Sequence, residues 1–187
     1  NYYDDVPESP SGSSPREVMG YTLEICREYA EHFGKDSVNL LFRGGTGLGK
    51  TFLAASIARV VSQKGFSVVY DTAVSILEAF ELQKFDRAGT ESGEVYARIR
   101  RYMDCDLLIL DDLGTEMSTS FTQSALYKLI NGRLLREGKT LVTTNLSAED
   151  LRRRYSPQLA SRLEGEYITL RFAGRDIRAI KKEQGLS

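Results

Sequence analysis

Apolar and polar residues along this chain follow two alternating patterns. Short apolar runs predict strands at 40–42, 66–70, 107–110, 140–144 and 167–172. Apolar residues at helical spacing predict helices over 15–34, 50–65, 74–80, 95–102, 120–138, 149–154 and 157–163. Because strands and helices alternate, we predict a three-layer α/β domain with a mostly parallel, five-stranded sheet.

Residues that start or break helices set the boundaries of these elements. Ser14 followed by Pro15 is a helix-start signal, and Ser120 with Gln123 forms a capping-box pattern. Residues 1–14 are rich in proline and serine, which predicts a flexible linker. Residues 15–187 are expected to form a single domain, with a polar loop over 86–93.

The composition narrows the classes of protein that this chain can belong to. With 187 residues, 41% of them hydrophobic, the chain can bury the core of one domain. It has no run of the roughly 18 apolar residues that a membrane span needs, and its polar, acidic start is unlike a secretory signal. Two distant cysteines and one histidine argue against a disulfide framework and a zinc site. These features fit a reduced cytoplasm.

Charge is unevenly distributed, although the net charge is only −1. Residues 151–187 contain nine Lys/Arg and four Asp/Glu, whereas residues 1–150 contain sixteen and twenty-two. A basic segment of this kind can contact nucleic acid, a phosphate or an acidic partner, or it can be only a solvated face. The sequence leaves these alternatives open.

The run GGTGLGKT follows the strand predicted at 40–42 and matches the phosphate-loop pattern G-x-x-x-x-G-K-[ST]. Glycines let successive backbone N–H groups turn toward phosphates, and the helix that follows adds the positive end of its dipole. The lysine is expected on the β- and γ-phosphates and the threonine on Mg²⁺. The predicted nucleotide-binding residues are Gly44, Gly45, Thr46, Gly47, Leu48, Gly49, Lys50 and Thr51.

A second element of a nucleotide site is predicted in the run DLLILDDLG, where four apolar strand residues end in two carboxylates. Asp111 is expected to hold Mg²⁺ opposite Thr51, and Asp112 is expected to polarise the attacking water as a catalytic residue. A full α-β unit separates this strand from the phosphate loop, as in oligomeric ATPases. Together with the second carboxylate, this spacing favours hydrolysis over phosphoryl transfer to a metabolite.

Two further side chains are candidate catalytic residues. Asn145 ends the strand at 140–144, where it can orient water or contact the γ-phosphate; a helix-capping asparagine is the alternative. Arg162 lies on a predicted short helix in the run LASRL, where an isolated arginine is usually a surface ion pair. In an oligomeric ATPase, an arginine at this place projects into the neighbour's nucleotide and contributes about 10³ to 10⁵ in rate.

Taken together, GGTGLGKT, LLILDDLG, LVTTN, LASRL and GRDIR resemble the AAA+ ATPases of the bacterial helicase-loader family, of the DnaC/DnaI type, with IstB-type transposition helpers next. The likeness runs from about Asn39 to Arg178. It implies a P-loop NTPase fold that binds and hydrolyses ATP with Mg²⁺, with Asn145 as sensor I and Arg162 as a trans-acting finger. It also implies contact with single-stranded DNA, ATP-dependent self-association, and attachment to the replicative helicase through a separate N-terminal domain preceding Asn1.

The chain departs from the wider AAA+ pattern at two places. Asp112 stands where many AAA+ proteins have the longer glutamate, so we expect slow turnover. Only fifteen residues follow Phe172, too few for a full helical lid, which the loader family also lacks. Arg175 or Arg178 is therefore a candidate for a sensor II-like or DNA-facing role.

Several functional questions stay open at the level of the sequence. The basic residues that can contact DNA can equally line a solvated helix face. A transposition helper, a metabolite kinase and a binding module that holds ATP without turnover are the alternatives to a helicase loader. The candidate DNA-contacting residues are Lys84, Arg87, Arg98, Arg100 and Arg101.

Overall fold

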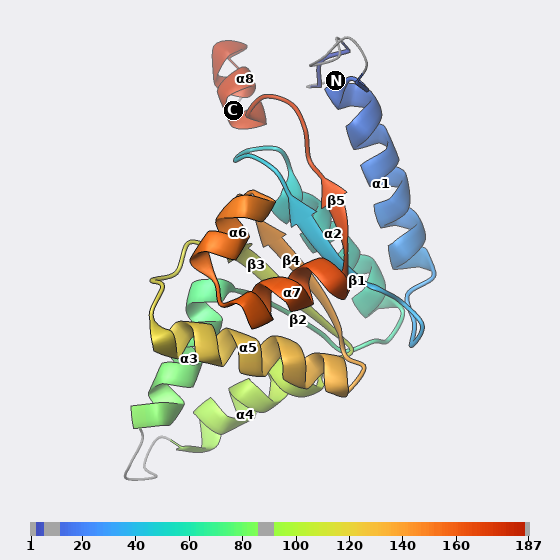
Figure 1. Cartoon of the computed structure of the whole chain (residues 1–187). Helices are drawn as coiled ribbons and strands as arrows, with labels where there is room; N and C mark the ends of the chain where they lie inside the picture. Colours follow the sequence, from blue (N-terminus) through green and yellow to red (C-terminus); the bar gives the residue numbers. More distant parts are fainter. Residues whose placement is uncertain (1–2, 6–11, 86–91, 186–187) are drawn as a thin grey trace.

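A parallel β-sheet with helices on both faces forms the body of the protein (Figure 1). The computed structural model describes residues 3–5, 12–85 and 92–185. The strands are β1 (Asn39–Arg43), β2 (Val68–Thr72), β3 (Leu107–Leu113), β4 (Lys139–Thr144) and β5 (Tyr167–Arg171). The helices are α1 (Pro15–Glu31), α2 (Lys50–Gln63), α3 (Ala73–Phe85), α4 (Ser92–Asp104), α5 (Ser120–Leu135), α6 (Ala148–Arg154), α7 (Pro157–Gly165) and α8 (Ile177–Glu183). The predicted α/β class is confirmed, and α8 is the helix that the periodicity did not predict.

The strand order explains why functional segments far apart in sequence meet. The order is β2-β3-β4-β1-β5, and every pairing is parallel. β4 therefore separates the phosphate-loop strand β1 from β3. Because the strands are parallel, their carboxyl ends share one edge, and the segments that follow β1, β3 and β4 lie together there.

The central strands are buried on both faces, which explains their continuous apolar runs. Leu40 and Phe42 of β1 face a core formed with α1 and α2. Leu41, the residue between them, faces a second core formed with α3, α4, α5 and α7. Successive residues of a strand point to opposite faces, so each central strand supplies both cores.

Capping residues fix where the helices begin. Ser14 caps α1 and Pro15 opens the helix, as predicted, and Glu17 completes a capping box. The capping box predicted from Ser120 and Gln123 is wrong by one residue. Thr119 has extended backbone and its hydroxyl accepts a hydrogen bond from the backbone N–H of Thr122, so Ser120 is already the first helical residue.

The ends of the described chain lie near each other and near the phosphate loop (Figure 1). The Tyr3 hydroxyl donates to the Leu48 carbonyl at 2.9 Å, and Arg16 N–H donates to the Asp4 carbonyl at 3.0 Å. The described residues 3–5 thus contact the domain, while the linker assignment for 1–14 as a whole stays a prediction. After β5, the described residues form the single short helix α8.

The loop predicted over 86–93 falls mostly on 86–91, outside the described residues, and α4 already begins at Ser92. Arg87 lies in the same segment. No helix among the described residues combines the length and apolarity needed to cross a membrane.

A fully buried arginine joins the amino edge of the sheet to two helices. The Arg133 side chain on α5 is 0% exposed. Its guanidinium donates to the backbone carbonyls of Tyr102, Cys105 and Lys139 at 2.8, 3.0 and 2.6 Å, and to the Thr140 hydroxyl at 2.9 Å. Burial lowers the pKa of this guanidinium. Arg133 therefore satisfies buried oxygen atoms near the end of α4 and the starts of β3 and β4 by donating hydrogen bonds to them.

Candidate functional site

The phosphate loop connects β1 to α2 at the carboxyl edge of the sheet. Gly47 and Gly49 have φ of 72° and 92°, in the left-handed region that favours glycine. α2 begins at Lys50 with Gly49 as its N-cap, and a glycine has no side chain to cap the first N–H groups. These N–H groups and the dipole of α2 make the loop suitable for binding an anion such as a phosphate.

Lys50 is held at the centre of the loop. The side chain is buried, and its ammonium donates to the carbonyls of Gly44 and Gly45 at 2.7 and 2.6 Å and to Asn145 Oδ1 at 2.6 Å. Burial lowers the pKa of this ammonium, and the negative charges of Asp112 and Asp111 oppose the shift. The lysine is therefore preorganised beside the loop, where phosphate oxygens are acceptors that it can bind.

Asp111 lies between the loop and two neighbouring strands. Its Oδ1 accepts hydrogen bonds from Thr51 Oγ1 at 3.3 Å and from Thr143 Oγ1 at 2.5 Å, and its Oδ2 accepts one from the Tyr70 hydroxyl at 2.6 Å. A hydroxyl and a carboxylate are hard oxygen ligands of the kind that Mg²⁺ prefers. The structure thus places Thr51 and Asp111 side by side, and their chemistry fits the predicted metal site.

Asp112 follows Asp111 with strained backbone. Its φ is 55°, and non-glycine residues in this region concentrate at functional sites. The backbone N–H of Asp112 donates to Thr143 Oγ1 at 3.0 Å, which helps to fix this geometry. Burial, and after it the charge of Asp111, raises the pKa of the Asp112 carboxyl, while Lys50 and Arg178 oppose the shift. The carboxyl is therefore close to the positive charges that surround the phosphate loop.

Asn145 is positioned beside Lys50 by the end of β4. The alternative interpretation, in which Asn145 caps the following helix, is wrong because Ser147 is the N-cap of α6. The Ser147 hydroxyl accepts a hydrogen bond from the Asp150 N–H at 3.0 Å, so the helix start is already satisfied. The amide of Asn145 is thus left to contact the loop through Lys50.

The C-terminal segment distinguishes the two arginines that the sequence could not separate. The Ile177 N–H donates to the Gly47 carbonyl at 3.0 Å, so α8 begins directly on the phosphate loop. Arg178 is the next residue, and its positive charge acts to lower the pKa of both Lys50 and Asp112. Arg175 instead forms an exposed ion pair with Asp4 at 3.6 Å. Arg178 is therefore the candidate of the two that follows the contact between α8 and the phosphate loop directly.

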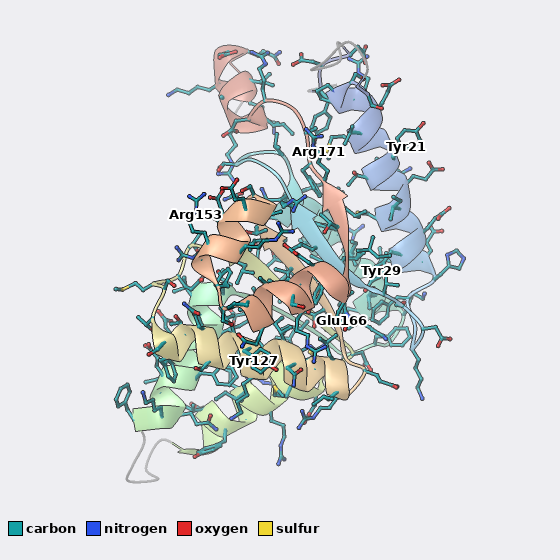
Figure 2. All side chains as sticks on the ribbon, in the orientation of Figure 1. Tyr21, Tyr29, Tyr127, Arg153, Glu166 and Arg171 are labelled. Carbon is teal, nitrogen blue, oxygen red and sulfur yellow. The ribbon has the colours of Figure 1, made fainter. Side chains whose placement is uncertain are left out.

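Arg162 is not brought to the phosphate loop of its own chain. It lies on α7 and forms an i,i+4 ion pair with Glu166 at 3.3 Å, with 42% of its side chain exposed. The Glu166 carbonyl accepts a hydrogen bond from Asn39, the first residue of β1, at 3.3 Å. Figure 2 shows Glu166 at the end of α7 where β5 begins, which is the amino edge of the sheet. The two candidate parts of the site thus lie at opposite edges.

The basic residues proposed for DNA contact differ in their surroundings. Arg98 donates to Asp71 Oδ2 at 3.0 Å and to the Tyr102 hydroxyl at 2.5 Å, so it holds α4 against β2. Burial raises the pKa of Asp71, but the hydrogen bonds from Tyr102 and Arg98 outweigh it and lower the pKa below its usual value. Arg100 and Arg101 are exposed. Of these three arginines, Arg100 and Arg101 are therefore more accessible to DNA than Arg98.

Several residues of the site were missed at the sequence level. Thr143 could have been found, because it lies in β4 two residues before Asn145; its hydroxyl donates to Asp111. Tyr70 carries no motif signal, and Asp176 lies in the run GRDIR, where only the two arginines were considered. Glu116 is also buried, where it accepts hydrogen bonds from the Gly114 N–H and the Tyr155 hydroxyl and links the loop after β3 to α6.

Several known proteins are similar to this chain in sequence or in structure. The "Replicative helicase loader DnaC" of Escherichia coli (strain K12) is 24% identical over 141 residues, which are 75% of this chain and 56% of that protein. A "Putative insertion sequence ATP-binding protein y4uH" of Sinorhizobium fredii is 24% identical over 182 residues, which are 95% of this chain and 70% of that protein. The chain thus spans little more than half the length of the DnaC protein it matches.

A solved structure of the "Replication initiator DnaA bound to AMPPCP and single-stranded DNA" superposes with a TM-score of 0.67. Its sequence identity to this chain is 21%, and the match covers 98% of this chain and 54% of that one. This likeness shows a common fold, and the predicted three-layer α/β fold with a parallel, five-stranded sheet is confirmed.

The family of IstB-like ATP binding proteins matches residues 25–161. The match includes the phosphate loop, both carboxylates and Asn145, and it covers more than half of the chain. It bears out the prediction of an ATP-binding domain with a phosphate loop. The chain belongs to the family of IstB-like ATP-binding proteins.

Proposed function

We propose that this chain is an ATP-driven switch of the helicase-loader type, whose ATPase site is completed by a neighbouring copy. ATP and Mg²⁺ would bind at the carboxyl edge of the sheet, where Lys50, Thr51 and Asp111 converge. Hydrolysis would need the Arg162 of the neighbouring copy. The observation that carries this proposal is the placement of Arg162 at the opposite edge of its own sheet.

Each residue of this site has a task that follows from its chemistry. The phosphate loop and Lys50 would bind the phosphates, while Thr51 and Asp111 would hold the metal. Asp112 would accept a hydrogen bond from the attacking water, and Asn145 would orient that water or the γ-phosphate. When bound, Mg²⁺ supplies positive charge that offsets the negative charge of the phosphates. Asp112 is one methylene shorter than glutamate, which supports slow turnover.

Single-stranded DNA is the proposed polymer on which this switch acts. The similarity to DnaC and to a DnaA structure that contains single-stranded DNA supports this proposal. Arg100 and Arg101 on α4 offer exposed positive charge. Lys84, near the end of α3, makes cation–π contacts: its Nζ lies 5.5 Å from the ring centroid of Phe85 and 4.6 Å from that of Phe121. Aromatic and basic groups together are typical of single-strand binding surfaces.

The replicative helicase is the proposed protein partner, bound through an N-terminal domain outside this chain. A transposition helper that acts with a transposase is the second candidate, and the similarity to an insertion-sequence ATP-binding protein over 95% of the chain favours it. Recovery of a helicase or of a transposase with the full-length protein would separate the two. A metabolite kinase is disfavoured by the strand between β1 and β3 and by the second carboxylate.

The test of a shared site is complementation between two inactive variants. Lys50→Ala should lose nucleotide binding, whereas Arg162→Ala should keep binding and lose hydrolysis by about 10³-fold or more. An equal mixture should regain hydrolysis, since the Lys50→Ala copy supplies Arg162 to the intact loop of the other. ATP hydrolysis per subunit, measured against protein concentration with and without single-stranded DNA, should rise with concentration.

Arg153→Ala is the matched control for this test. Arg153 is also an exposed arginine in an i,i+4 ion pair, with Glu149 at 2.9 Å, and Figure 2 shows it on the surface at α6. Its substitution should leave hydrolysis unchanged. Equal loss of nucleotide binding in Lys50→Ala and Arg162→Ala, or a mixture no more active than its components, would contradict the trans-acting role of Arg162.

A further inference from the structure

The phenol of Tyr70 makes a contact that the nucleotide-site motifs do not explain. Tyr70 lies in the edge strand β2, and 38% of the residue is exposed. Its hydroxyl donates to Asp111 Oδ2 at 2.6 Å. A half-exposed phenol can hydrogen bond to water instead, so this contact adds little to the stability of the fold. The main effect of the Tyr70 contact is to orient the Asp111 carboxylate.

The strand register explains how Tyr70 reaches this carboxylate. In the parallel pairing of β2 with β3, Tyr70 is opposite Ile109 and Thr72 is opposite Asp111. Residues two apart in a strand share a face, so Tyr70 and Asp111 are diagonal neighbours on the face of the sheet that carries α2. Diagonal neighbours on adjacent strands are within reach of a long aromatic side chain. Residue 70 is thus a position from which a tyrosine can contact Asp111.

Asp111 is held from both sides by hydroxyl groups. Thr51 and Thr143 donate to Oδ1, and Tyr70 donates to Oδ2. These three contacts fix the plane of the carboxylate with Oδ1 toward Thr51, the other candidate metal ligand. A carboxylate has about four lone-pair sites, so the Tyr70 contact leaves room for a ligand water or a metal. Hydrogen bonds to the ligands of a metal site orient those ligands.

We propose that Tyr70 is a positioning residue for the Mg²⁺ that accompanies the nucleotide. Its hydroxyl holds Oδ2 of Asp111, so the carboxylate needs no reorientation when the metal binds. Tyr70 acts through Asp111 and does not itself bind the phosphates. This inference rests on the proposed function, because it presupposes that the loop binds ATP with Mg²⁺.

The test measures how Mg²⁺ strengthens nucleotide binding. A fluorescent, non-hydrolysable ATP analogue is titrated into the protein in EDTA and at graded concentrations of free Mg²⁺. Tyr70→Phe keeps the ring and removes only the hydroxyl. In EDTA, we expect Tyr70→Phe to bind the analogue with the wild-type affinity. The Mg²⁺ concentration that gives half of the gain in affinity should be about tenfold higher in this variant than in the wild type, because hydrogen bonds to charged groups are among the stronger ones.

Tyr29→Phe is the matched control. The Tyr29 hydroxyl also makes one hydrogen bond, to the Val38 carbonyl at 3.0 Å, and Figure 2 shows Tyr29 on α1, well below the phosphate loop. This variant should show the wild-type Mg²⁺ dependence. A second measurement compares Asp111→Asn with the double variant that also carries Tyr70→Phe. The two should have the same Mg²⁺ dependence, because Tyr70 acts through the Asp111 carboxylate and both variants lack it.

The outcomes separate this inference from the proposed function. An unchanged Mg²⁺ dependence in Tyr70→Phe overturns the inference, as does an equal loss of affinity in EDTA and in Mg²⁺, which would indicate general loosening of the site. A shift that persists in the Asp111→Asn background also overturns it. A wild-type protein that fails to bind the analogue at any Mg²⁺ concentration refutes the proposed function itself.

Discussion

Replacing Gly47 by alanine tests whether the start of α8 is packed against the phosphate loop. A Cβ atom at Gly47 would lie 1.9 Å from Oδ1 and 2.2 Å from Cγ of Asp176. Asp176 is the N-cap of α8, and its Oδ1 accepts a hydrogen bond from the Arg178 N–H at 2.8 Å. The carboxylate must therefore move away, and α8 loses its cap and its close contact with the loop.

The magnitude of this effect follows from a comparison with Gly65. Gly65 has φ of 91°, and nothing lies within 4 Å of a Cβ placed there, so Gly65→Ala introduces only the left-handed strain of about 1–2 kcal/mol. Gly47→Ala carries the same strain. It also loses a helix cap, which costs about 1 kcal/mol, and the hydrogen bond from Ile177 to Gly47, which contributes about 1 kcal/mol. We therefore expect the Gly47 variant to be less stable than the Gly65 variant by about 2 kcal/mol.

Urea denaturation of the two variants without nucleotide measures this difference, since the midpoint and slope give the free energy of unfolding. Nucleotide affinity is the second measurement, and it should fall in Gly47→Ala and stay near the wild-type value in Gly65→Ala. Equal free energies of unfolding for the two variants would refute the argument that Asp176 and α8 are seated on the loop.

Two further predictions concern arginines away from the phosphate loop. Arg133→Met should lower the free energy of unfolding by about 4 kcal/mol or more, because it leaves several buried oxygen acceptors without a donor; urea denaturation measures this, and a loss below 1 kcal/mol would contradict it. If Arg100 and Arg101 contact single-stranded DNA, replacing both by alanine should weaken binding and make its log–log dependence on salt less steep by about 0.7 per lost contact. Fluorescence anisotropy over a range of salt concentrations tests this, and an unchanged slope would exclude these residues.

The sequence predicted the fold well because the signals that set it are local. Apolar runs, helical spacing and the Ser14–Pro15 start all act within a few residues, and the structure confirms the elements that they indicate. The capping box at Ser120 was misplaced because Thr119 offers an equivalent hydroxyl one residue earlier. Two adjacent capping residues cannot be ranked without knowing the backbone conformation of each.

The site was only partly predictable, since some of its contacts depend on strand register. The phosphate loop and the two carboxylates belong to motifs, so their residues could be named. Tyr70 could not be named, because its contact with Asp111 requires the pairing of β2 beside β3. The choice between Arg175 and Arg178 likewise depended on where α8 is seated, which no local pattern specifies.

The positions of the two halves of the site constrain any assembly that joins them. One copy supplies the phosphate loop, Asp111 and Asn145 at the carboxyl edge of the sheet, whereas Arg162 lies on α7 toward the amino edge. If Arg162 serves the site of a neighbour, the interface joins two different surfaces and is heterologous. A heterologous contact repeats as a ring or as a helical filament, and it cannot close as a two-fold dimer. Sedimentation with the non-hydrolysable analogue should therefore show species that grow beyond a dimer as protein concentration rises, and a dimer that stays the limiting species would contradict a shared site of this geometry.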